Sequence, residues 1–242
     1  MSAFQNICVT AVLAALLLWG CGSPHGQPRP GSETLAPKDV LDFATLFSEN
    51  CAGCHGAEGR GGAALALANP IYLAIADDAA IHKVITKGIP GTAMAAFAES
   101  AGGMLTDKQV DVLATGIRSQ WGRPGVLDGA NPPSYAAKSP GNRSQGEAGY
   151  KTYCKSCHGP GGRGGAKGSS ITDDSFLALL TDQELRTLVI VGRPELGAPD
   201  WRGNVPGKPM SDQEITDVVA WLASRRSQDP GRPYTVSNYA NH

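Results

Sequence analysis

Two stretches of this 242-residue chain, CAGCH at Cys51–His55 and CKSCH at Cys154–His158, decide its fold. Both have the pattern Cys-x-x-Cys-His, and their first cysteines lie 154 − 51 = 103 residues apart. The glycine-rich run after each histidine is repeated as well, since Gly-Arg-Gly-Gly-Ala occurs at 59–63 and again at 162–166. The sequence therefore contains an internal repeat, which predicts two similar domains.

The spacing within each stretch suits the covalent attachment of a haem. Two thiols one helical turn apart can bond to the two vinyl groups on one edge of a porphyrin, and the histidine that follows then lies beneath the iron. We expect two covalently attached haem c groups. The expected attachment cysteines and iron-ligating histidines are Cys51, Cys54 and His55 for the first haem, and Cys154, Cys157 and His158 for the second.

Other chemistry of paired cysteines fits this pattern less well. A zinc ribbon places its two cysteine pairs about 15–20 residues apart, far closer than the pairs in this chain. A redox-active Cys-x-x-Cys motif usually lies beside a βαβ pattern, and the sequence shows none. A structural disulfide would leave both histidines unexplained.

Apolar spacing predicts three helices in each domain: one that leads into the Cys-x-x-Cys-His stretch, a short middle helix and a final helix. The middle helices carry apolar residues at i, i+3 and i+4 and end at Gly88 and Gly192. Thr106 and Ser211 are suitable N-caps for the final helices. We therefore predict an all-α fold in which each domain wraps about three helices around its haem.

The repeat also sets the expected domain boundaries. The first domain covers residues 38–121 and the second covers 144–226. Residues 122–143 hold four prolines and four glycines, which indicates a linker, and 227–242 form a polar tail. Domains of this size have a marginal side-chain core, and aromatic residues make up only 6% of the chain. A buried haem would supply the missing apolar surface.

Composition excludes two broad classes of protein. Hydrophobic residues make up 41% and charged residues 18%, which is too apolar for a disordered chain. The formal net charge of -1 supplies no positive field for phosphates, so we expect no nucleic-acid partner.

The N-terminus has the features of an export signal, which we assign to residues 1–20. The apolar stretch Ile7–Gly20 is too short to span a bilayer, which needs about 20 such residues. The run Leu18–Cys21 resembles the lipobox of bacterial lipoproteins, in which the cysteine is lipidated. We expect lipid on Cys21 and a proline-rich tether over 21–37. A plain cleaved signal and an uncleaved anchor are the alternatives.

Both domains resemble class I c-type cytochromes, here in a tandem dihaem lipoprotein form. The run Asp217–Leu222 in the final helix is typical of the bacterial members. In that family a glycine on the first helix packs against an aromatic residue on the last, as Gly146 and Trp221 would. The first domain has Phe43 and Gly116 at these positions, so we expect the same contact with the large and small residues exchanged.

The resemblance also implies a methionine as the sixth iron ligand. The loop Gly88–Met94 matches the ligand loop of the family, so Met94 is expected to bind the first iron. Met104 is its competitor, and its other expected role is packing at the haem edge. Phe47 and Tyr150 each lie four residues before the first cysteine of a motif and are expected to pack against haem.

The second domain departs from the family at this ligand. Ala198 occupies the matching loop position and cannot bind iron, whereas Met210 aligns with the apolar Leu105. We expect Met210 to reach the iron through a folded-over loop. The alternative is that Met210 is a core residue and that the iron has five ligands or borrows one.

A histidine as the sixth ligand of the second iron is the weakest alternative. The histidines outside the two motifs are His25, His82 and His242, and none of them has a recognisable motif around it. Of these, His82 follows the apolar Ile81 in the predicted middle helix and is expected to be a partly exposed helical residue.

Three further side chains are candidates for contact with a haem. Arg60 and Arg163 lie in the glycine-rich runs and would either pair with a haem propionate or be solvated in their loops. Trp201 would either donate its indole N–H to a propionate or pack on the haem.

The resemblance implies an electron carrier that passes single electrons between membrane or periplasmic redox proteins. We expect no enzyme activity and no small-molecule substrate. The protein would be exported across the bacterial inner membrane and held by lipid on its periplasmic side or at the outer membrane. Two alternatives stay open: a haem enzyme that uses an open position on the second haem, and a fixed subunit of a respiratory or photosynthetic complex.

Overall fold

The computed structural model describes residues 35–227. Within that range it contains helices, turns and two isolated β-bridges but no strand, which confirms the all-α prediction for this part of the chain. The expected signal 1–20, Cys21, His25, His242 and the tail from residue 228 lie outside the described residues. The chain divides into two units between Asp39 and Val40, and the 3-10 turn η1 (Pro37–Asp39) belongs to the first.

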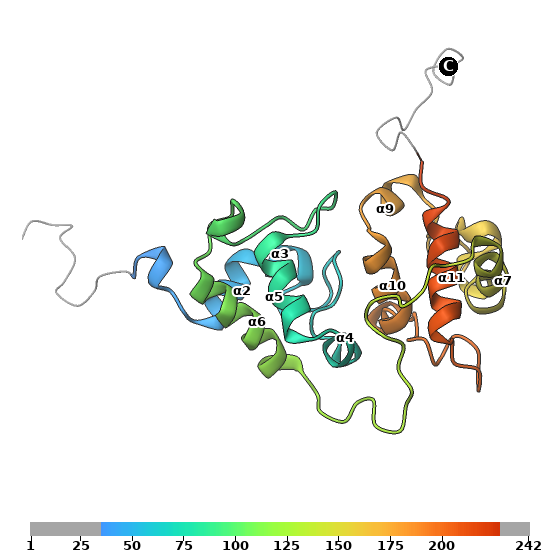
Figure 1. Ribbon diagram of the computed structural model, residues 1–242, viewed down its shortest axis with the longest axis horizontal. Coiled ribbons are helices and arrows are strands. Elements are labelled where there is room, and N and C mark those ends of the chain that lie inside the picture. The colour runs from blue at the N-terminus through green and yellow to red at the C-terminus, as the bar shows by residue number, and fades with distance from the viewer. Residues whose placement is uncertain (1–34, 228–242) are drawn as a thin grey trace, which may run out of the picture. The chain divides into compact units, whose positions relative to one another are not determined.

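Val40–His242 contains two lobes with the same order of helices (Figure 1). The first lobe consists of α2 (Phe43–Asn50), α3 (Ala52–His55), α4 (Pro70–Ile75), α5 (Asp78–Lys87), the 3-10 turn η2 (Glu99–Ala101) and α6 (Asp107–Trp121). The second consists of α7 (Arg143–Tyr153), α8 (Lys155–His158), η3 (Pro160–Gly162), α9 (Asp174–Ala178), α10 (Asp182–Val191), η4 (Pro194–Leu196) and α11 (Asp212–Ala223).

Each described lobe therefore has five α-helices where we predicted about three. The difference comes from two short elements. The Cys-x-x-Cys-His stretch forms its own turn, α3 or α8, and a further short helix, α4 or α9, precedes the middle helix. None of the helices within 35–227 has the length and apolar character that a bilayer crossing requires.

Local signals in the sequence set where the longer helices begin and end. Thr106 and Ser211 cap α6 and α11, and each forms a reciprocal capping box with the residue three positions on. Gly88 and Gly192 end α5 and α10 with φ of 62° and 65°, a backbone conformation that favours glycine. The predicted caps and stops are confirmed.

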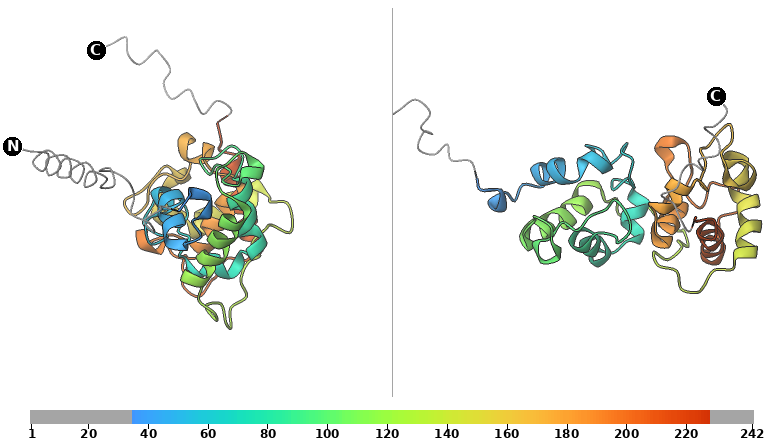
Figure 2. Two further views of the ribbon diagram at one scale, coloured as in Figure 1. Left: turned by 90° about the vertical axis from the view of Figure 1, so that its left-hand side faces the viewer. Right: turned by 90° about the horizontal axis from the view of Figure 1, so that it is seen from above.

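The first and last long helices of each lobe pack together, α2 on α6 and α7 on α11 (Figure 2). A Cβ atom added at Gly116 would lie 2.1 Å from Cδ2 of Phe43. A Cβ atom added at Gly146 would lie 1.9 Å from the Asp217 carbonyl oxygen and 2.9 Å from Cβ of Trp221. The predicted contacts are confirmed, including the exchange of large and small residues in the first lobe.

Aromatic rings fill the space beside these crossings. In the first lobe Trp121 packs edge-on against Phe47 and Phe43, with ring centroids 4.9 and 5.7 Å away. In the second lobe Tyr150 stacks on Trp221 at 4.4 Å. Phe47 and Tyr150 are buried, as expected of core residues. The role of Trp121 was not predicted.

An arginine near the end of each lobe links the short helix, α4 or α9, to the helix that follows it, α5 or α10. Arg118 and Arg226 both donate to backbone carbonyls at the end of the short helix and pair with an aspartate in the first turn of the following helix. The partners are Leu73, Ala76 and Asp78 for Arg118, and Leu177, Leu180 and Asp182 for Arg226. The two lobes thus share a capping device that the sequence repeat did not reveal.

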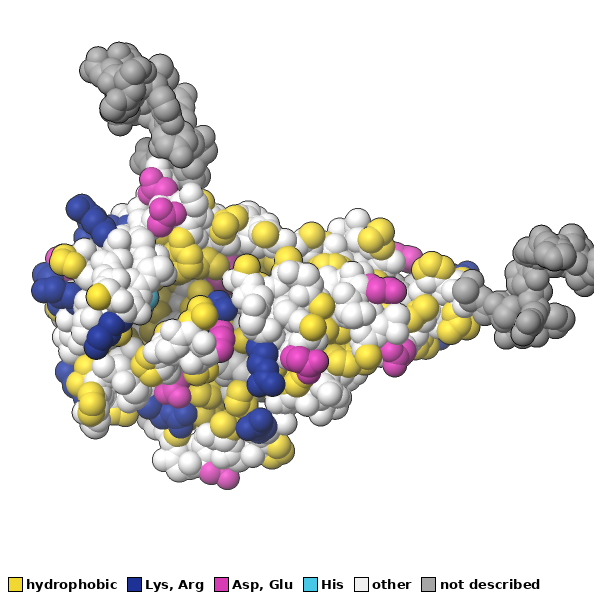
Figure 3. Space-filling model, turned by 180° about the vertical axis from the view of Figure 1, so that it is seen from behind, with side chains coloured by type: hydrophobic (Ala, Val, Ile, Leu, Met, Phe, Trp, Pro, Cys, Tyr) yellow, Lys and Arg dark blue, Asp and Glu magenta, His cyan; other side chains and the backbone are white. Residues whose placement is uncertain are grey.

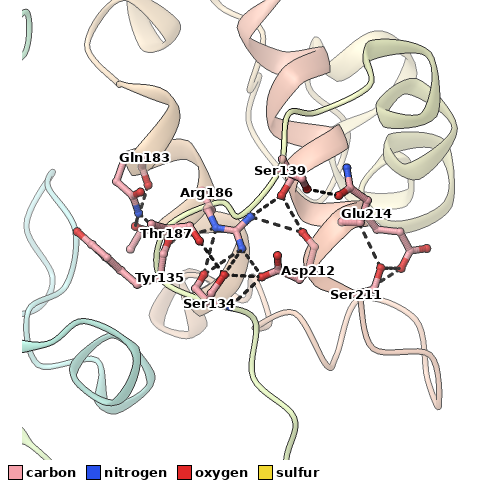
Figure 4. Close-up of polar contacts among 12 residues, drawn as sticks. Ser134, Tyr135, Ser139, Gln183, Arg186, Thr187, Ser211, Asp212 and Glu214 are labelled. Carbon is pink, nitrogen blue, oxygen red and sulfur yellow. Dashed lines mark hydrogen bonds and ion pairs between the residues drawn. The ribbon is translucent and has the colours of Figure 1, made fainter.

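The second half of the predicted linker lies hydrogen-bonded on the second lobe, and we call residues 134–142 the strap (Figure 4). Arg186 is 2% exposed and donates to the carbonyl oxygen of Ser134 at 2.9 Å and to that of Tyr135 at 3.1 Å. Its guanidinium also pairs with Asp212, which accepts from Ser134 N. Arg186 therefore joins the strap to α10 and α11.

Candidate functional site

Each Cys-x-x-Cys-His stretch forms a single helical turn that begins at a break in the preceding helix. Cys51 ends α2 with φ −119° and ψ −35°, and Cys154 ends α7 with φ −117° and ψ −31°. The second cysteine and the histidine of each motif then lie in α3 or α8. All four cysteines in the described range are unpaired. The two motifs therefore have the same backbone conformation, a short helical turn after a break at the first cysteine.

Both motif histidines are oriented by a backbone carbonyl group. Nδ1 of His55 lies 2.7 Å from the Leu65 carbonyl oxygen, and Nδ1 of His158 lies 2.8 Å from that of Ser169. A carbonyl oxygen can only accept, so Nδ1 carries the proton, and in the neutral ring Nε2 keeps its lone pair. This is the tautomer that binds a metal through Nε2.

The surroundings of His55 also favour its neutral form. Burial lowers the pKa of His55, and the hydrogen bond to Leu65 opposes this shift only in part. A neutral imidazole is the form that ligates a metal. Nothing in the sequence pointed to the carbonyl groups of Leu65 and Ser169, because any residue type can supply a backbone acceptor.

The glycine-rich loops fold back closely onto the motifs. A Cβ atom added at Gly62 would lie 2.1 Å from the Cys54 carbonyl oxygen, and one at Gly165 would lie 2.6 Å from that of Cys157. A Cβ atom at Gly168 would lie 3.0 Å from Nδ1 of His158. Glycine is therefore required where each loop passes its motif.

The first cysteine of each motif, Cys51 or Cys154, has a thiol that resists losing its proton. Burial raises the pKa of Cys51 to about 11 and that of Cys154 to about 12, and the second cysteine of each motif adds to the shift. Thiols with such values stay protonated at neutral pH. Residues 35–227 contain no group of three or more His, Cys, Asp or Glu side chains placed to hold a metal ion. Two cysteines and a histidine whose Nδ1 donates to a backbone carbonyl, held in one turn, form a donor set that fits a haem bonded through two cysteines.

Met94, the expected sixth ligand of the first haem, lies half-buried in the loop after α5. Its carbonyl oxygen accepts from Ile89 N at 2.8 Å, and its own N–H donates to Thr92 Oγ1 at 3.1 Å. Its competitor Met104 is 82% exposed. The loop thus braces Met94, whereas Met104 lies on the surface.

The loop after α10 in the second lobe has the same backbone bond as the loop after α5, but Ala198 stands where the first lobe has Met94. The Ala198 carbonyl oxygen accepts from Arg193 N at 2.9 Å, as that of Met94 accepts from Ile89 N. Met210 is buried instead in front of α11, where its N–H donates to the Trp201 carbonyl oxygen at 2.9 Å. The structure therefore brings Ala198, and not Met210, to the place that Met94 occupies.

The other candidate side chains lie as follows. Arg60 and Arg163 are exposed. Trp201 is buried, with the guanidinium of Arg202 lying 4.7 Å from its ring centroid. His82 is partly exposed, as predicted.

On the face drawn in Figure 3, basic and acidic side chains are interspersed with hydrophobic ones, and hydrophobic side chains line a hollow.

The chain belongs to the family described as "Cytochrome C oxidase, cbb3-type, subunit III", which it matches over residues 38–115 and 141–222. The cbb3-type cytochrome c oxidase subunit CcoP of Azospirillum sp. (strain B510) is 33% identical over 143 residues, which is 52% of this chain and 43% of that protein. The cytochrome bc1 complex cytochrome c subunit of Mycobacterium bovis is 25% identical over 190 residues, which is 77% of this chain and 64% of that protein.

The chain covers less than two thirds of the length of each of these relatives. Among solved structures, a chain of the reducing HAO-like protein complex of Kuenenia stuttgartiensis aligns with 80% of this chain and 100% of its own length, at 19% identity and a TM-score of 0.42. Two family segments, each with its own Cys-x-x-Cys-His turn, identify a c-type cytochrome.

Proposed function

We propose that the protein carries single electrons between redox proteins through two covalently bound haems. The observation that supports this most is the duplicated motif turn, in which a carbonyl group holds each histidine with Nε2 free. The relatives named as subunits of a cbb3-type oxidase and a bc1 complex support electron transfer as the task.

The side chains of this chain have distinct roles in the proposal. Each bound haem would supply an iron that accepts and releases one electron. The motif cysteines would hold the porphyrin, and Nε2 of His55 or His158 would bind its iron. Met94 would supply a thioether ligand to the first iron, which would raise the reduction potential relative to a second nitrogen ligand. The helix crossings keep these ligands in place.

Electron exchange by the purified holoprotein tests this function. Membranes that contain a quinol-oxidising complex should reduce both haems when quinol is added, and a membrane-bound terminal oxidase should reoxidise them. An inhibitor of the quinol-oxidising complex should block the reduction. If both haems stay oxidised under these conditions, the proposed task is wrong.

We also propose that lipid on Cys21 holds the protein at the outer face of the inner membrane or at the outer membrane. The support is the lipobox-like run Leu18–Cys21. A single acyl chain binds membranes only marginally, so the several chains of a bacterial lipoprotein are needed. Cys21→Ser should release the protein into the soluble fraction or leave the precursor unprocessed. A wild-type protein that is already soluble would contradict the anchor.

A further inference from the structure

The loops after the middle helices follow one backbone pattern in both lobes. Gly88 and Gly192 end α5 and α10, and the next residue in each case donates to the carbonyl oxygen five positions on. A Cβ atom at Gly88 would lie 2.5 Å from the Met94 carbonyl oxygen, and one at Gly192 would lie 2.7 Å from that of Ala198. Ala198 is thus the structural counterpart of Met94.

Met210 has a different counterpart. Leu105 and Met210 each directly precede the N-cap of the last helix, and both are buried. The N–H of Leu105 donates to the Phe97 carbonyl oxygen at 2.7 Å, and that of Met210 donates to Trp201 at 2.9 Å. Met210 therefore occupies a core position, which is the alternative that the sequence left open.

The sulfur atom of Met210 already has a polar neighbour. Asn204 Nδ2 lies 3.8 Å from Met210 Sδ and 3.3 Å from the Asp200 carbonyl oxygen. The loop that would have to fold over is closed at its base by the bond between Met210 and Trp201. Moving the sulfur to the place of Ala198 would break these contacts.

The polar side chains described for the loop between Gly192 and Met210 have contacts of their own. Its two acidic residues are engaged, Glu195 with Arg193 and Asp200 with Arg202. Lys208 Nζ lies 5.3 Å from the ring centroid of a tyrosine. The acidic side chains of this loop are therefore paired, its lysine lies over an aromatic ring, and an alanine methyl group stands at the loop position of Met94.

We propose that the second haem has no side-chain ligand at its sixth position and that Ala198 leaves there a binding site for a small neutral diatomic molecule of the carbon monoxide or nitric oxide class. This inference rests on the proposed function, because it requires that His158 hold a haem. A neutral ligand fits because an apolar methyl group and paired charges offer little to stabilise an anion.

Carbon monoxide titration of the reduced holoprotein tests the site. Haem content is first determined by mass, and the oxidised protein is examined by magnetic and optical spectroscopy. We expect two haems, one high-spin and one low-spin iron, and one carbon monoxide bound per two haems.

Three variants locate the site. Ala198→Met should make the second iron low-spin and abolish carbon monoxide binding. Met210→Leu, which copies Leu105, should leave the spectrum and the stoichiometry unchanged. Met94→Ala should raise the stoichiometry to two.

Two results would overturn the inference while leaving the proposed function intact. The first is a two-haem wild-type protein with two low-spin irons that binds no carbon monoxide. The second is a Met210→Leu variant that gains a carbon monoxide site, which would assign Met210 as the ligand. A wild-type protein with fewer than two haems would overturn the proposed function and this inference together.

Discussion

Gly116 lies where α6 crosses α2, and the ring of Phe43 occupies the space that a side chain would need. We predict that Gly116→Trp lowers the free energy of unfolding by about 1–3 kcal/mol, the usual cost of overpacking. The midpoint of urea unfolding, followed by circular dichroism of the holoprotein, measures this loss.

The double variant Phe43→Gly with Gly116→Trp should recover part of that stability, because the large residue then stands where Trp221 stands in the second lobe. Simple additivity of the two single effects would show that the residues do not share one space. Phe43→Gly alone is the necessary control.

Asp42 caps α2, and its carboxylate accepts from the backbone N–H and the hydroxyl group of Thr45. These bonds lower the pKa of Asp42 below its ordinary value of 3.8. Because the pKa is depressed in the folded state, this stabilisation is present above the unfolded value and is lost as the pH falls through the folded value.

We predict that Asp42→Asn, which keeps a capping side chain but cannot titrate, is less stable than the wild type near neutral pH. The difference should shrink as the pH falls below about 4. Urea unfolding of both proteins at several pH values measures it. A difference that does not change with pH would show that the charge of Asp42 is not involved.

At the scale of elements, Arg186 joins the strap to α10 and α11 through carbonyl groups and Asp212. We predict that Arg186→Met lowers the free energy of unfolding by about 1–3 kcal/mol, because its partly buried acceptors lose their donor. The strap should also become a site of limited proteolysis.

The exposed pair of Lys151 and Glu147 on α7 supplies a matched control. Lys151→Met should cost only about 0.3–0.5 kcal/mol, as expected of an exposed pair at i, i+4. If both variants lost the same free energy of unfolding, the burial of Arg186 would contribute no extra stability. An Arg186→Met protein whose strap resists proteases would contradict the fastening role.

At the scale of the whole molecule, each described lobe has its own motif turn and its own helix crossing. We predict that replacing Cys154 and Cys157 by Ala removes one haem and leaves the other bound. Mass spectrometry of protein matured in a competent host measures the loss. Disappearance of both haems would show that the first lobe cannot mature alone.

Features that depend on short spacing could be predicted from the order of the amino acids. The motif turns, the helix caps at Thr106 and Ser211 and the stops at Gly88 and Gly192 all involve residues a few positions apart. The exchange of Phe43 and Gly116 was also predictable, because the second copy of the repeat has the same contact in its ordinary form.

Features that join distant segments became visible only in the folded chain. The acceptors of the motif histidines are backbone carbonyl groups, which carry no sequence signal. Arg186 meets the strap only because three separate segments converge on it. The place of Met210 was ambiguous in the sequence, since loop length permits several paths. In the structure its N–H bonds to Trp201 as that of Leu105 bonds to Phe97, while the bonds to Arg193 hold Ala198 at the loop position of Met94.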